Sequence, residues 1–180
     1  MDLRRWFTLF VPLLMLSLLA SVLRPTPPES LSPEVLLAAI EEVRASRVID
    51  ELLADDGHYW HQFLQGVESG ELAWLGAAAQ LRPMLSVVHG QALERAVARA
   101  LPRAPASVLA LSRQGFSVRQ LCTPVGEGSS QNGGDRKWLD AAEKALSEMA
   151  RDSSPDESAH TACLARIRML SKAALSHSGP

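Results

Sequence analysis

Apolar residues recur at intervals of three and four positions along most of the chain beyond residue 32, which is the spacing of a buried helix face. No segment shows the strict alternation of a half-buried strand, and the chain is rich in Ala and Leu with few β-branched runs. We therefore expect an all-α fold, a compact bundle of about six to seven short helices. The predicted helices cover residues 33–54, 58–69, 72–81, 87–101, 106–114, 135–150 and 159–174, with a single further turn over 116–122.

Polar residues, prolines and glycines mark the ends of these helices. Ser32-Pro33-Glu34 supplies a capping hydroxyl, a proline where no N–H is needed and an acid beside the positive helix end, and Ser154-Pro155-Asp156-Glu157 repeats this chemistry. Asp55-Asp56-Gly57 is expected to end the first helix and cap the second, and Asp135 to cap the helix over 135–150.

The N-terminus has the pattern of an export signal. Arg4 and Arg5 precede eighteen uncharged, mainly apolar residues, 6–23. The small residues that a cleavage site requires are poorly placed, and the run would span roughly 27 Å as a helix, close to the hydrocarbon core of a bilayer. Residues 1–24 are thus either a cleaved signal peptide or an uncleaved signal anchor. Both interpretations place the rest of the chain in the periplasm or cell envelope, secreted or anchored.

The remaining chain divides into a spacer and one domain. Residues 25–32 are proline-rich and predict an extended spacer, and residues 33–177 have the size of a single helical domain. Within the domain, residues 123–134 are rich in Gly and Ser and predict a flexible loop. This loop lacks the spacing of a phosphate-binding P-loop, so it is interpreted as a linker.

Charge is distributed unevenly along the exported part. Without Asp2, Arg4 and Arg5 the chain holds 16 basic and 19 acidic residues, which does not favour a nucleic-acid partner. Residues 24–76 hold ten acids and three arginines, whereas residues 77–126 hold six arginines and one acid, Glu94. Either the two segments lie against each other and neutralise, or one face binds an oppositely charged partner.

Two cysteines, Cys122 and Cys163, are the only ones in the chain. In an oxidising compartment such a pair predicts a disulfide, which would stabilise the fold by about 4 kcal/mol through loop closure. Two buried free thiols and a redox pair are the alternatives, although the close C-x-x-C arrangement typical of redox pairs is missing.

Few residues suggest catalysis or cofactor binding. His58 and His61 lie three positions apart on one helical face, with Glu68 seven positions further on, which is sterically compatible with a metal site. Histidines at the wet margin of an amphipathic helix are the simpler interpretation. We expect no cofactor, no metal site and no enzymatic activity. Trp60, Trp74 and Trp138 are interpreted as core anchors, with interface contacts as the alternative.

Several motifs carry a resemblance. They are Asp55-Asp56-Gly57, Trp60, Phe63, Gly66, Ser69-Gly70, Trp74-Leu75, Leu101-Pro102, Pro105-Ala106, Val108-Leu109, Gly115-Phe116-Ser117 and Cys122. Over residues 35–165 the chain resembles uncharacterised exported all-helical proteins of proteobacteria. The resemblance implies an all-helical fold with a bridged cysteine pair and an envelope location, and it supplies no activity or site residue.

The leading hypothesis is an exported envelope protein that binds another envelope protein as an accessory module, of which an immunity or inhibitor protein is a special case. One alternative is a metal-dependent hydrolase that uses His58, His61 and an acid. Another is a membrane-anchored structural spacer. Membrane contact through residues 6–23 is expected if that segment is uncleaved.

Overall fold

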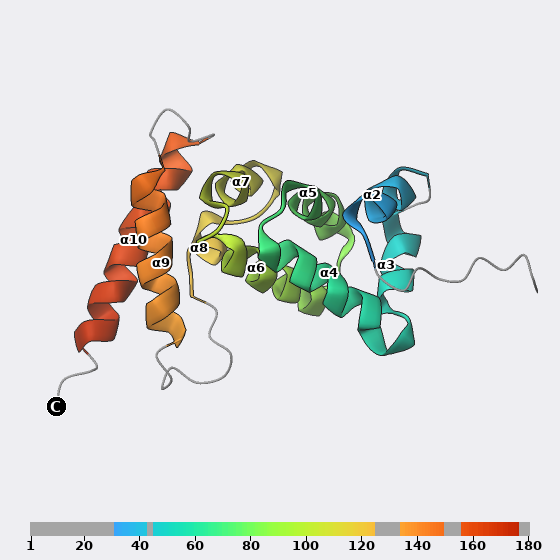
Figure 1. The fold of residues 1–180 in the computed structure, drawn as a ribbon, viewed down its shortest axis with the longest axis horizontal. Coiled ribbons are helices and arrows are strands. Elements are labelled where there is room, and N and C mark those ends of the chain that lie inside the picture. The colour runs from blue at the N-terminus through green and yellow to red at the C-terminus, as the bar shows by residue number, and fades with distance from the viewer. Residues whose placement is uncertain (1–30, 43–44, 125–133, 150–155, 177–180) are drawn as a thin grey trace, which may run out of the picture. The chain divides into compact units, whose positions relative to one another are not determined.

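The computed structural model describes residues 31–42, 45–124, 134–149 and 156–176 (Figure 1). The chain divides into two units, Met1–Ser30 and Leu31–Pro180, and the description concerns the second. The expected export segment 1–24, most of the spacer 25–32, most of the loop 123–134 and Ser154-Pro155 lie outside the described residues.

The described residues are all-helical and contain no strand, as the spacing of apolar residues predicts. They form nine α-helices, more than the six to seven expected, because the predicted helix 33–54 is two helices and the turn over 116–122 contains a helix of its own. The helices are α2 (Pro33–Glu42), α3 (Ala45–Leu53), α4 (His58–Ser69), α5 (Leu72–Leu81), α6 (Val87–Ala100), α7 (Pro105–Ala110), α8 (Val118–Leu121), α9 (Gly134–Glu148) and α10 (Glu157–Ser176). None of the helices in the described ranges is long and apolar enough to cross a membrane.

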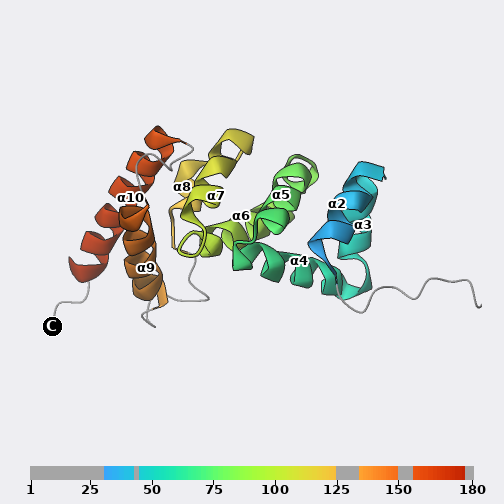
Figure 2. The same ribbon diagram turned by 45° about the horizontal axis from the view of Figure 1, so that its top comes forward.

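The predicted single helix over 33–54 is wrong. Helices α2 and α3 lie side by side, which two halves of one straight helix cannot do (Figures 1 and 2). The reason is that the buried residues of the two segments would not share one face of a continuous helix. In such a helix Arg47, about three turns after the buried Leu36, would lie on the same face as Leu36. The residues that α3 buries are instead Val48, Ile49 and Leu52. Two helices that contact each other can bury both sets.

The turn between α3 and α4 uses backbone conformation instead of side-chain capping. Asp55, Asp56 and Gly57 have φ angles of 50°, 56° and 75°, all in the left-handed region that Gly, Asn and Asp tolerate best. Gly57 is the N-cap of α4 and no side chain caps that helix, so the expectation that the aspartates cap it is wrong. Their role as turn residues is confirmed. Gly70, at φ 82°, ends α4.

Helices α4 and α5 contribute most of the aromatic core. Trp60 and Trp74 are 5% and 7% exposed, and both rings lie near that of Phe63, with centroids 5.5 and 6.2 Å from it. Their prediction as core residues is confirmed. Trp138 of α9 is half-buried, and its indole Nε1 donates a hydrogen bond to the carbonyl oxygen of Ala98 at 3.2 Å. It therefore joins α9 to α6.

Helix α10 is tied to the rest of the domain by a disulfide. Cys122, which follows α8, is bonded to Cys163 of α10, and the two Cα atoms are 5.4 Å apart. The predicted disulfide is confirmed, so the alternative of two free thiols is wrong. The buried His160 adds a second link, because its Nε2 hydrogen-bonds to the carbonyl oxygen of Leu146 in α9 at 2.9 Å.

Two helix starts differ from expectation. Helix α9 begins at Gly134, so Asp135 lies in the first turn and is not its N-cap. Helix α10 is capped by Asp156, whose Oδ1 accepts hydrogen bonds from the backbone N–H of Ala159 at 3.0 Å and from the hydroxyl of Ser158 at 2.7 Å. These two hydrogen bonds, with the nearby Arg113, hold the pKa of Asp156 below its usual range, because each favours the charged carboxylate.

Candidate functional site

The acidic and basic segments meet at the interface of α4 and α6. Arg99 Nη1 lies 2.6 Å from Glu68 Oε1, and Arg103 Nη1 donates to the carbonyl oxygen of Glu68 at 3.0 Å. One residue of the acidic segment, Glu68, therefore binds two arginines of the basic segment. Part of the charge imbalance seen in the sequence is thus neutralised inside the domain.

A third arginine, Arg82, pairs with the only acid of the basic segment, Glu94. Its Nε donates to Glu94 Oε1 at 3.0 Å, and its Nη2 bonds to the same oxygen. Glu94, on α6, is 6% exposed, and its other oxygen accepts a hydrogen bond from Gln120 Nε2 at 2.7 Å. Both carboxylate oxygens are thereby engaged, as a buried carboxylate requires.

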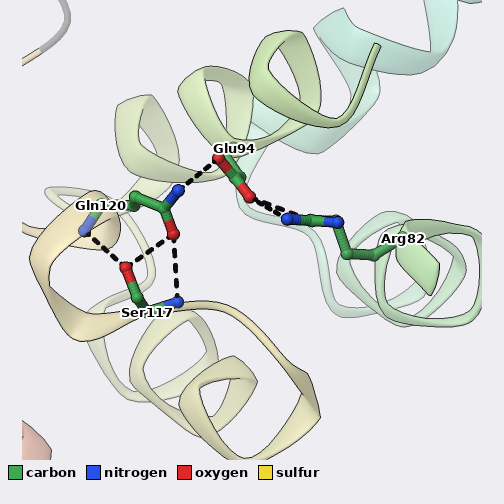
Figure 3. A network of polar contacts seen from close by, with 4 residues as sticks. All are labelled: Arg82, Glu94, Ser117 and Gln120. Carbon is green, nitrogen blue, oxygen red and sulfur yellow. Dashed lines mark hydrogen bonds and ion pairs between the residues drawn. The ribbon is translucent and has the colours of Figure 1, made fainter. Parts of the chain in front are cut away.

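Gln120 is held in turn by the N-cap of α8. Ser117 Oγ accepts a hydrogen bond from the backbone N–H of Gln120 at 3.2 Å, and the backbone N–H of Ser117 donates to Gln120 Oε1 at 3.4 Å, which completes a capping box. The Ser117 hydroxyl also donates to Gln120 Oε1 at 2.6 Å. Figure 3 shows Arg82, Glu94, Gln120 and Ser117 as one continuous polar network. The network joins the segment before α6, α6 itself and α8.

An open pocket of about 780 Å³ adjoins this network. Its walls come from α6, from α8 with its flanking residues, and from α10. The lining residues are Gln91, Glu94, Arg95, Ser117, Arg119, Gln120, Thr123, Pro124 and Arg166. Three of these residues are arginines and Pro124 is the only apolar one, so the pocket is cationic, with apolar surface supplied by the aliphatic parts of its long side chains.

Three arginines, one from each of three elements, give this pocket its charge. Arg95 of α6 and Arg119 of α8 are exposed, and their guanidinium groups have neither a hydrogen bond nor an ion pair to any described residue; the backbone carbonyl of Arg119 accepts a hydrogen bond from Thr123 Oγ1. Arg166 of α10 is half-buried, and its Nε and Nη2 donate to Thr123 Oγ1 at 3.2 and 3.1 Å. That partner is neutral, so it positions the guanidinium without cancelling its charge.

The chemistry that this arrangement supports is the binding of an anion. The carboxylate of Glu94 faces the guanidinium of Arg82, which leaves the positive charges of Arg95, Arg119 and Arg166 uncompensated by the other lining residues. Guanidinium groups hold carboxylates and phosphates through paired N–H donors and stay protonated at any physiological pH. We name these three residues the arginine triad.

The structure places His58 and His61 away from this pocket, on exposed positions of α4. His58 Nε2 is 2.8 Å from Gln62 Nε2, and its ring contacts that of Tyr59. Over the described ranges no group of three His, Cys, Asp or Glu side chains comes together that could hold a metal ion, and Glu68 is paired with Arg99. The two histidines share a face of α4 without a described third ligand.

Sequence reasoning found only part of the candidate site. Helical spacing places Arg95 on the outward face of α6, and the excess of arginine over residues 77–126 is a signal for a cationic surface. The Ser117-x-x-Gln120 spacing is a second signal, because it is that of a capping box and predicts the start of α8 next to Arg119. Nothing near Arg166 in the sequence relates it to the other two arginines.

Comparison of the chain with protein-family models, with curated proteins and with solved structures gives no match. The functional argument therefore depends on the geometry and chemistry of the described residues.

Proposed function

We propose that this chain is an exported accessory protein of the cell envelope that binds another protein, and that the surface around the arginine triad is its binding face. The basic residues and apolar run of the N-terminus support the location, as does the disulfide, because disulfides persist in oxidising compartments. The loose resemblance to exported proteobacterial proteins is consistent with the same location.

The observation that carries the proposal is the contrast between two sets of arginines. Arg82 and Arg99 are paired with carboxylates inside the domain, whereas the triad residues gather around an open pocket without a described counter-charge. Unpaired like charges next to one another repel, so such an arrangement costs stability unless a partner compensates it. A partner of opposite charge would be steered to this face and would remove the repulsion.

The lining residues favour binding over acid–base catalysis. Arginine cannot release a proton at physiological pH, and the described residues that line the pocket include no His, Cys or Lys. The one carboxylate, Glu94, is buried and has both oxygens hydrogen-bonded.

Site-specific photo-crosslinking in the native host tests the proposal. A photoreactive amino acid replaces Gln91, an exposed residue of the pocket rim, and in a matched control it replaces Gln80, an exposed glutamine of α5 that does not line the pocket. We expect a discrete protein adduct from position 91 in the envelope fraction and none from position 80. Replacing the triad residues by Gln should abolish the adduct.

Three results would contradict the proposal. An adduct that forms equally at Gln80 and Gln91, or that persists without the triad, would exclude this face as the specific binding site. Recovery of the chain from the cytoplasm with reduced cysteines would exclude export. The mass of the recovered chain also shows whether residues 1–24 have been removed.

A further inference from the structure

We infer that the arginine triad recognises an acidic peptide segment, one that presents two or more Asp or Glu carboxylates to the pocket. This inference rests on the proposed function and names the chemistry that the partner must carry. It follows from the composition of the pocket, from the way its walls are joined, and from the donors that remain available.

The charge of the lining disfavours an apolar anchor. Pro124 is the only apolar residue among the described lining residues, so a hydrophobic side chain placed in the pocket would desolvate guanidinium groups without pairing them. Gln91, Ser117 and Thr123 add amide and hydroxyl groups between the arginines. A polar, negatively charged segment is the occupant that satisfies these groups.

The walls of the pocket are joined before any ligand arrives. The Glu94–Gln120 hydrogen bond links α6 to α8, and the disulfide between Cys122 and Cys163 links the end of α8 to α10. The backbone positions that carry the three arginines are therefore held relative to one another. A preorganised site loses less entropy on binding than one that must first assemble.

The three arginines differ in the role that the geometry assigns to them. Arg166 is positioned by Thr123 and keeps the Nη1 amino group available for a ligand carboxylate. Arg95 and Arg119 are exposed and their guanidinium groups have no described partner, so their side chains can adapt to further carboxylates at the rim. A ligand with several carboxylates spaced along a chain uses all three, which a single carboxylate does not.

Three other anions fit the pocket less well. Single-stranded nucleic acid is bound by stacking on aromatic side chains, and none of the lining residues in the described ranges is aromatic. A lipid headgroup brings acyl chains that need an apolar surface beside the arginines. A free phosphate ion would fill only a small part of about 780 Å³.

Fluorescence anisotropy with a labelled hexaglutamate peptide tests the inference on the purified protein with its disulfide intact. A hexaglutamine peptide of equal length is the ligand control. We expect hexaglutamate to bind and hexaglutamine not to bind, with affinity that falls as salt rises. Inorganic phosphate, single-stranded oligothymidine and vesicles that contain anionic lipid are tested as competitors, and none should displace the peptide at equal charge concentration.

Two sets of variants separate the site from the net charge. Replacing Arg95, Arg119 and Arg166 by Gln should weaken binding by about tenfold or more, since hydrogen bonds to charged groups are lost. The matched control replaces Arg47, Arg136 and Lys137 by Gln, which removes the same charge from exposed positions outside the pocket. It should leave binding within about twofold. The double variant Arg95→Gln/Arg119→Gln changes only exposed side chains, so a weakened affinity there cannot be attributed to misfolding.

The outcomes distinguish this inference from the proposed function. Equal loss in both triple variants would overturn the inference, because net charge and not the pocket would then govern binding. Stronger binding of the oligonucleotide or the vesicles would also overturn it. If hexaglutamate fails to bind while the crosslinked adduct still requires the triad, the acidic segment is excluded and the binding face stands. Peptide binding without any adduct in the host excludes the proposed partner protein instead.

Discussion

Replacing Gly66 by Ala should destabilise this protein, although Ala is the better helix former. Gly66 lies in the last turn of α4, against the side chain of Trp74 in α5. A Cβ atom there would lie 2.5 Å from both Cδ2 and Cε2 of Trp74 and 2.9 Å from its Cγ. Trp74 is 7% exposed and packs against Phe63, so the indole has little room to move aside.

The magnitude follows from two opposing effects. Ala instead of Gly in a helix interior contributes about 1 kcal/mol of stability. Inserting a methyl group into a closely packed core costs about 1 to 3 kcal/mol, and the upper end applies where the clash is with a buried ring. The expected net effect is a loss of about 2 kcal/mol, which corresponds to a fall in melting temperature of about 6 °C for a domain of this size.

Thermal unfolding followed by circular dichroism measures this effect, and the chain offers a matched control. Gly76 lies within α5, and no atom lies within 4 Å of a Cβ built at that position. Gly76→Ala should therefore show the helix propensity alone and raise the melting temperature by about 3 °C. Replacing Gly by Ala is thus expected to lower the melting temperature in α4 and to raise it in α5.

A rise in melting temperature for both variants would refute the packing argument at Gly66. The double variant Gly66→Ala/Trp74→Phe provides a second check, because the smaller ring makes room for the methyl group. It should be more stable than the sum of the two single effects predicts. Simple additivity would show that the two residues do not interact.

Three further outcomes are expected. Replacing Cys122 and Cys163 by Ser should lower the unfolding free energy by about 4 kcal/mol in urea titrations and weaken hexaglutamate binding, because α10 is released from α8. Glu94→Ala should cost about 2 kcal/mol, since it leaves Arg82 and Gln120 without their acceptor, and Glu94→Gln should cost less. Asp156→Ala should lower the melting temperature at neutral pH; because the folded-state pKa of Asp156 is depressed, this difference should shrink as the pH falls below about 4 in a series of melts.

Each of these outcomes has a result that contradicts it. Unchanged peptide affinity in the cysteine variant would show that α10 keeps its place without the bond. Equal losses for both Glu94 variants would show that charge, and not a lost acceptor, determines the effect. A pH-independent difference for Asp156→Ala would exclude its carboxylate as the cause.

Most helix ends could be predicted because their signals are local. Pro105 opens α7, and Gly115, at φ 88°, ends the 3₁₀ turn that follows it, because proline suits a first helical turn and glycine a left-handed residue. Helical spacing alone does not reveal the division of residues 33–54, because each half keeps that spacing while the buried face changes between the two halves. The sequence contains the signal, since charged Arg47 stands where a continuous stripe needs an apolar residue.

The candidate site was predictable only at the level of charge. The excess of arginine over residues 77–126 indicates a cationic region, yet it does not say which arginines are paired. Arg99 and Arg95 lie one turn apart on α6, but only Arg99 reaches a carboxylate, because α4 presents Glu68 on that side. The pairing of each arginine depends on the neighbouring helix and not on its own sequence.

The sequence by itself determined the helical class, most helix ends and the only possible cysteine pair, because each depends on local spacing, local backbone preference or a count of two. Only the tertiary structure decided that α2 and α3 pack side by side, that Glu94 is used by Arg82 and Gln120, and that Arg166 reaches the pocket of Arg95 and Arg119. Each of these features joins residues of different helices or turns. They depend on how helices pack, which the spacing within any one helix does not specify.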